Sequence, residues 1–296
     1  MIGGAAAHVI RGFLMGLADI VPGVSGGTIA LVLGIYERLI RNIRRGSGAV
    51  ASLIRLDLSG SVRKLREVDW VFLVSLLGGI LLAVVTMAGV LTTQLEERPE
   101  VMSALFFGLI IASIYVSLQM VKSRDLFRIV VLVASSAISF WLLGLRSGVV
   151  ENPTLLMVFG AGALAICAMI LPGVSGSFIL LMLGMYQYIL DAVDNRDLAV
   201  LGVFAIGAVV GLGSFSTLLN WLLKNYHDTV LVLLIGVMVG SLRVLWPWPS
   251  SEFGLDQVDL SWPESATFWP ALVAVVLGDG LVVGLSAMSR DSARRS

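Results

Sequence analysis

Two copies of the short motif P-G-V-S-G carry the residues whose types and spacing best suit the binding of an anion. The motif begins at Pro22 and returns at Pro172. Proline and glycine inside an apolar run interrupt a membrane helix and free backbone N–H groups. Glycine lets the backbone approach a ligand closely, and serine or threonine adds a hydroxyl donor. The candidate ligands of a phosphate are Ser25, Gly26, Gly27 and Thr28 in the first copy and Ser175, Gly176 and Ser177 in the second.

A helix that begins directly after such a break presents unpaired N–H groups and the positive end of its dipole to an anion. We therefore predict that the two breaks face each other at mid-membrane and hold a phosphate. The alternative is that Pro-Gly makes a tight turn and the serine caps the next arm. Segments 22–40 and 172–190 share 10 of 19 residues, which favours a site. A Walker-type loop is excluded because no Gly-Lys-Ser/Thr follows either motif.

Arg11 and Asp19 are the charged residues of the first arm, and their spacing of eight places them on one face of a helix. Arg11 could bind phosphate with two N–H groups, or it could extend to the lipid headgroups. Asp19 could pair with Arg11, take up a coupling proton, or cap the broken backbone. The matching positions in the second copy are Ala161 and Met169. The predicted site is therefore not fully symmetric.

A further carboxylate, Asp279, lies between two glycines in the apolar segment 268–288. A lone carboxylate in an apolar segment needs a partner or a proton, so Asp279 is a candidate for coupling or for a bond to a neighbouring helix. His8 and His227 are too few and too scattered for a metal site. We find no catalytic triad and no aspartate cluster for Mg²⁺. We expect no enzyme and no cofactor beyond a coupling proton or sodium ion.

The composition places these residues in a membrane protein. The chain is 57% hydrophobic and 14% charged, whereas a soluble domain carries about 25% charged residues. The formal net charge is zero, so no overall field favours a nucleic acid. We predict an all-α fold, because each apolar segment is long enough for one membrane span. The predicted spans are 70–93, 101–121, 129–146, 200–222, 229–245 and 268–288.

The repeated motif predicts one membrane domain, 1–296, made of two repeats. The first repeat, 1–146, contains a motif hairpin at 5–40 and three spans. The second, 154–288, contains a hairpin at 154–190 and three spans. Arms such as 5–20 and 27–40 are shorter than a ~30 Å hydrocarbon core requires. We interpret each pair of arms as a re-entrant hairpin; a single broken span or two full passes are the alternatives. An odd number of crossings per half makes the repeats inverted.

The distribution of basic residues sets the orientation. With 38–69 in the cytoplasm, the basic residues of the predicted outer loops are only Arg98, Arg146, Arg196 and Arg243. This agrees with the positive-inside rule and places both chain ends in the cytoplasm. Segment 41–69 mixes apolar and basic residues, so we expect an amphipathic helix at the cytoplasmic headgroups.

The motifs at 19–28 and 171–177 resemble those of the PopT-type polyprenyl-phosphate transporter family. The resemblance implies translocation of undecaprenyl phosphate, a carrier lipid of cell-wall synthesis, across the inner membrane by alternating access. It implies a headgroup-binding role for the matching serines and glycines; roles for Arg11, Asp19 and Asp279 follow from residue chemistry alone. The expected partners are the lipid and the bilayer, with no nucleic acid. A transporter of a small soluble anion, or an intramembrane enzyme acting on a lipid phosphate, is the alternative.

Overall fold

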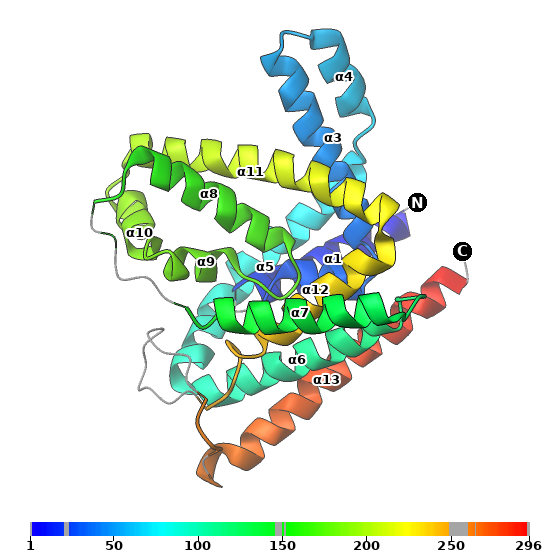
Figure 1. Cartoon of the computed structure of the whole chain (residues 1–296), viewed down its shortest axis with the longest axis vertical. Coiled ribbons are helices and arrows are strands. Elements are labelled where there is room, and N and C mark those ends of the chain that lie inside the picture. Colours follow the sequence, from blue (N-terminus) through cyan, green and yellow to red (C-terminus); the bar gives the residue numbers. More distant parts are fainter. Residues whose placement is uncertain are drawn as a thin grey trace.

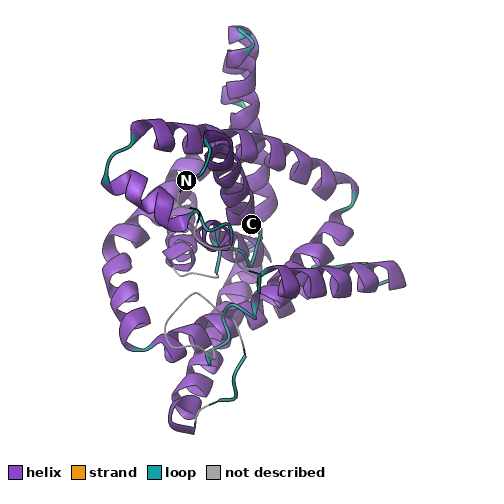
Figure 2. Cartoon of the chain, turned by 60° about the vertical axis from the view of Figure 1, so that its left-hand side comes forward, coloured by secondary structure: helices purple, strands orange, loops and turns teal. Residues whose placement is uncertain are grey.

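The protein is all-helical. The structure, a computed structural model, describes residues 2–20, 24–145, 150, 152–248, 260–263 and 265–294. Within these residues there are thirteen α-helices and no strand (Figure 2). The helices are α1 (Ile2–Ile20), α2 (Gly26–Val32), α3 (Tyr36–Ile54), α4 (Leu58–Arg66), α5 (Trp70–Glu97), α6 (Pro99–Leu118), α7 (Leu126–Leu142), α8 (Leu155–Ile170), α9 (Gly176–Met182), α10 (Tyr186–Asp194), α11 (Leu198–Asn225), α12 (His227–Ser241) and α13 (Ser265–Arg294).

Four helices are long and apolar enough to cross a bilayer, which makes this a multi-pass membrane protein. They are α5, α6, α11 and residues 265–287 of α13. The two other predicted spans, 129–146 and 229–245, are shorter than the sequence indicated. Helix α7 has 17 residues and α12 has 15, or about 25 and 22 Å of helix. The apolar sequence continues beyond both helices, but its backbone forms turns at 143–144 and 242–245.

The arm that follows each motif is not one helix, contrary to the prediction for 27–40 and 177–190. Helices α2 and α9 have seven residues each and are followed by a turn. Gly34 and Gly184 stand in these turns with φ of 67° and 65°, which side chains with a Cβ adopt only at a cost. Helix α10 then leaves α9 at an angle of 112°. Each hairpin therefore contains three helical pieces.

The helices pack in four main pairs. Helix α1 lies along α5, and the corresponding α8 lies along α11. Helix α6 lies along α13, and α12 lies along α7, so these two pairs each join helices that are distant in sequence. The ends of α1 and α13 that carry the chain termini lie on one side of this bundle (Figure 1). Every residue of the short helix α2 is buried, whereas the short helix α9 packs mainly against α8.

Segment 41–69 forms a helical hairpin rather than one amphipathic helix. Helix α3 ends at Ile54 and α4 begins at Leu58, with Leu56 at a φ of 60° between them. This hairpin projects from the helical bundle in both views (Figures 1 and 2). Leu53, Leu56 and Leu58 are exposed among its basic residues. The mixture of exposed leucine and arginine matches the predicted contact with lipid headgroups.

Close backbone contact between α1 and α5 yields a test of the packing. A Cβ on Gly79 would lie 2.1 Å from the carbonyl oxygen of Val9, whereas a Cβ on its neighbour Gly78 would meet nothing within 4 Å. We expect Gly79→Ala to lower the free energy of unfolding by about 1–3 kcal/mol, because the helices must separate. Gly78→Ala should leave it unchanged or raise it by up to about 1 kcal/mol, the difference in helix propensity. Thermal unfolding of both variants in detergent measures the difference; equal midpoints would contradict the packing.

Candidate functional site

The two motifs meet in the interior, as predicted. Ser25 donates a hydrogen bond of 3.0 Å from its Oγ to the carbonyl oxygen of Met169. The N–H of Gly173 donates to Thr28 Oγ1 at 2.9 Å. Ser25 and Thr28 are buried, with exposed fractions of 1% and 0%. The structure therefore joins the break after α1 directly to the break after α8, across 145 residues of sequence.

The backbone amides of the first motif are occupied. Asp19 Oδ1 accepts the N–H of Gly26 at 2.6 Å, and Ser25 Oγ accepts the N–H of Gly27 at 3.1 Å. Asp19 thus caps the start of α2, which is one of the three roles that its position suggested. Its carboxylate stands where an external anion would bind the N-terminus of α2. Pro22 and Gly23 lie outside the described residues.

The second motif lacks this carboxylate. Met169 replaces Asp19, and a Cβ on Gly176 would lie 2.6 Å from its Cγ, just as a Cβ on Gly26 would lie 2.6 Å from Asp19 Oδ2. Ser175 makes no capping hydrogen bond; its Oγ lies 2.8 Å from that of Ser177. Ser175 is buried and Ser177 is half-buried. The start of α9 therefore presents two hydroxyls and no negative charge, unlike the start of α2.

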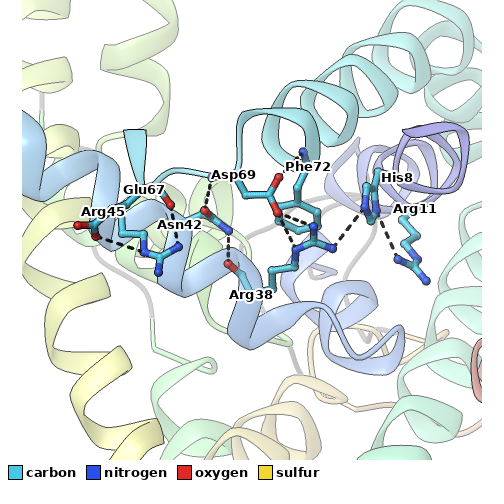
Figure 3. A network of polar contacts seen from close by, with 8 residues as sticks. All are labelled: His8, Arg11, Arg38, Asn42, Arg45, Glu67, Asp69 and Phe72. Atoms are coloured by element: carbon cyan, nitrogen blue, oxygen red, sulfur yellow. Dashed lines mark hydrogen bonds and ion pairs between the residues drawn. The ribbon is translucent and has the colours of Figure 1, made fainter. Parts of the chain in front are cut away.

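Arg11 lies apart from both motifs. Its Nη1 is 3.4 Å from Nδ1 of His8, one turn earlier on α1, and it has no contact with Asp19. Nη1 of Arg38 is 3.3 Å from Nε2 of the same histidine (Figure 3). Arg11 thus belongs to a polar group where α1, α3 and the start of α5 converge. The predicted pair of Arg11 with Asp19 is not formed.

Arg38 organises this polar group. Its Nε donates to Asp69 Oδ2 at 3.2 Å, and its guanidinium carbon lies 4.3 Å from the centre of the Phe72 ring (Figure 3). The bonds from Arg38 are the main cause that holds the pKa of Asp69 below its ordinary value. Asp69 also caps α5 through the N–H of Phe72. This pair was not predicted from the sequence, where its one signal is an aspartate placed as an N-cap before an apolar run.

Asp279 is half-buried on α13 and makes no hydrogen bond or ion pair with any described residue. Its neighbour Gly278 packs against α6, where an added Cβ would lie 2.0 Å from the carbonyl oxygen of Leu105. The structure therefore does not bring Asp279 to the motifs. Its coupling role stays a prediction.

Thr28 provides a test of the junction between the motifs. We expect Thr28→Val, which keeps the shape of the side chain, to leave the buried N–H of Gly173 without an acceptor. The cost should be about 1–3 kcal/mol of unfolding free energy. Thr28→Ser, which keeps the hydroxyl, is the matched control and should stay closer to the parent. Thermal unfolding in detergent measures both variants; a Val variant as stable as the Ser variant would contradict the bond.

Comparison with known proteins identifies the family of this chain. The model of a family described as VCA0040-like, undecaprenyl phosphate translocase-like, matches residues 15–258. A Vibrio cholerae protein named "Polyprenyl-phosphate transporter" is 41% identical over 239 residues, covering 81% of this chain and 77% of that protein. A Staphylococcus aureus protein of the same name is 29% identical over 257 residues, covering 81% and 86%. No solved structure matches the chain. The chain belongs to the undecaprenyl phosphate translocase-like family.

Proposed function

We propose that this protein transports a polyprenyl phosphate, with undecaprenyl phosphate as substrate, across the cytoplasmic membrane. The observation that carries the proposal is the direct contact between the two motifs through Ser25 and Thr28. The names of the relatives, which are polyprenyl-phosphate transporters, support the substrate class. A family of transporters fits a protein that moves the lipid without changing it chemically.

The proposed site would replace the water around the phosphate headgroup of the lipid. A phosphate headgroup carries one to two negative charges and cannot cross hydrocarbon without replacement of its water. The hydroxyls of Ser175 and Ser177, with the first amides of α9, would supply hydrogen bonds on one side. On the other side, Gly26 would supply its N–H after Asp19 withdraws, and Ser25, Gly27 and Thr28 would supply theirs once their present hydrogen bonds open. The polyprenyl tail would remain among the lipids.

In this proposal transport is coupled to protons, because the carboxylate of Asp19 must leave the start of α2 before the phosphate can bind there. The carboxylate and the phosphate compete for the N–H groups at the start of α2, since both are anions that need the same donors. Protonation of Asp19 removes its charge and weakens its bond to the N–H of Gly26, so that the phosphate can compete for this donor. Phosphate binding would then be accompanied by proton uptake. Arg11, which lies eight residues before Asp19 on α1, would contribute through the electric field of its charge rather than by contact with the motif.

The two repeats, 1–146 and 154–288, would be inverted, with both chain ends in the cytoplasm. In transporters of inverted repeats, broken helices meet at the midplane, and the halves move relative to each other to expose the site to either side. Two of the bonds at this site donate from side chains of the first repeat to backbone oxygens of the second, at Met169 and Ile170. Movement of the halves would break and remake such bonds.

Reconstituted vesicles test the proposal. Labelled undecaprenyl phosphate should move between leaflets at least tenfold faster with the protein than without it, and inorganic phosphate in excess should not stop the movement. Absence of any acceleration would overturn the proposal. Uptake of free phosphate without lipid movement would instead identify a transporter of a soluble anion. Release of phosphate from the lipid would identify an enzyme.

A further inference from the structure

A cavity lies at the end of α2 that is remote from the motif. Its volume is about 280 Å³, close to the lower limit of about 300 Å³ for ligand pockets, so it suits a small chemical group. Four helical segments and the turn at Gly34 surround it. Its lining residues are Leu31, Gly34, Tyr36, Glu37, Arg38, Arg41, Met120, Leu223 and Leu231.

The lining divides into an apolar part and a charged rim, which consists of Glu37, Arg38 and Arg41. Leu31, Leu223 and Leu231 are buried and form the apolar part. Arg38 and Arg41 are three residues apart on α3, so they lie on one face of that helix. An apolar wall beside guanidinium groups fits a molecule that joins an anionic headgroup to an apolar chain.

The charged side chains of the rim differ in whether they already bind another side chain. Glu37 Oε1 lies 2.8 Å from Nε2 of His227, and Arg38 is held by Asp69. Arg41 is exposed and has no hydrogen bond or ion pair with any described residue. A guanidinium is planar and matches two phosphate oxygens at once. Arg41 is therefore the cation of the rim that is available to a ligand, beside an arginine whose position is fixed.

The cavity is structurally connected to the motifs. Tyr36 lines the cavity, and its hydroxyl donates at 3.1 Å to the carbonyl oxygen of Ile170, just before the second motif. Leu31 belongs to α2, which carries the first motif at its other end. A helix of seven residues is about 10 Å long, so a headgroup would travel that distance from one place to the other.

We propose that this cavity is a second site for a phosphate monoester, with Arg41 as its ligand and Arg38 as a positioning residue. The headgroup occupies it on the cytoplasmic side, before or after it occupies the motifs. This inference rests on the proposed transport function. The same chemistry would bind the headgroup of a prenyl lipid or free phosphate, and the two sources are distinguished by competition.

Binding of farnesyl phosphate to the purified full-length protein in detergent tests the site. To weaken binding at the motifs, the measurement is made in the Ser175→Ala, Ser177→Ala background. There, Arg41→Gln should weaken binding about tenfold, the loss expected for one charge-assisted contact at an open site. Arg44→Gln, an exposed arginine of the same helix outside the cavity, is the matched control and should bind as the background does. Farnesol, which lacks the phosphate, should not distinguish the variants.

The outcomes separate the site from the transport function. Equal binding by the Gln variants at 41 and 44 would overturn the second site, while lipid movement in vesicles would still support transport. If inorganic phosphate competes as well as farnesyl phosphate does, the site takes free phosphate; if it competes at least tenfold more weakly, the site takes the lipid. A wild-type protein that neither binds farnesyl phosphate nor moves lipid would overturn both proposals.

Discussion

Replacement of Ser175 and Ser177 by alanine is expected to lower transport of undecaprenyl phosphate by about 100-fold or more. Each hydroxyl would donate to a charged phosphate oxygen, and such a bond is worth about 1.5–3 kcal/mol. Two lost bonds therefore cost about 3–6 kcal/mol, which exceeds a factor of 100. The fold should survive, because the two hydroxyls bond to each other and cap nothing. Lipid movement in vesicles and thermal unfolding measure the two effects.

A second pair of serines provides the control for this prediction. Ser135 and Ser136 on α7 both donate to the carbonyl oxygen of Leu132 and contact neither motif. Their double replacement by alanine should leave transport within about twofold of the parent. If the two double variants transport equally well, the hydroxyls at the start of α9 do not hold the headgroup. The phosphate site must then lie elsewhere.

Replacement of Asp19 by asparagine is expected to abolish the response of transport to a pH gradient. Asparagine still accepts the N–H of Gly26, so the start of α2 stays capped and the protein stays folded. It carries no charge and exchanges no proton. In the parent protein, a lower pH on the side of the membrane from which Asp19 is accessible favours the protonated form of its carboxyl group. That form in turn favours phosphate binding. Transport in vesicles with and without an imposed gradient measures the response.

Asp279 is the rival carboxylate for this role, and Asp279→Asn is the matched variant. We expect it to retain the gradient response, because Asp279 has no contact with either motif in the described structure. Loss of the response in Asp279→Asn alone would transfer coupling to α13. A parent protein whose rate ignores the gradient would remove proton coupling from the mechanism altogether.

The doubled motif was the part of the site that the sequence could predict, because two near-identical breaks in equivalent halves are readable without coordinates. The sequence also shows that Met169 stands in the second copy where Asp19 stands in the first. This difference explains why a carboxylate caps the N-terminus of α2 but not that of α9. The sequence also indicated the helical membrane architecture and the long spans α5 and α11.

Features that depend on tertiary contact were not predictable in this way. The pairing of Arg38 with Asp69 joins residues 31 apart, and nothing in their local sequence marks it. Gly34 and Tyr36 recur in the second copy as Gly184 and Tyr186, but hydropathy does not report the sign of φ, so the turn itself was not predicted. The shortness of α12 has the same origin: apolar residues continue to 245, and only backbone geometry ends the helix. Residues from four helices line the cavity beside Arg41, so no single stretch of sequence indicates it.

The two motif segments are joined by three neutral hydrogen bonds, from Ser25 to Met169, from Gly173 to Thr28, and from Tyr36 to Ile170. The halves also pack along α6 with α13 and along α7 with α12. At about 1 kcal/mol each, these bonds contribute about 3 kcal/mol to the junction of the motifs, so a movement that separates the motifs loses about that much in addition to any lost packing. On the second half these bonds come from the main chain, so a substitution at Met169 should leave them in place, whereas substitutions at 25, 28 and 36 remove the side chains that form them.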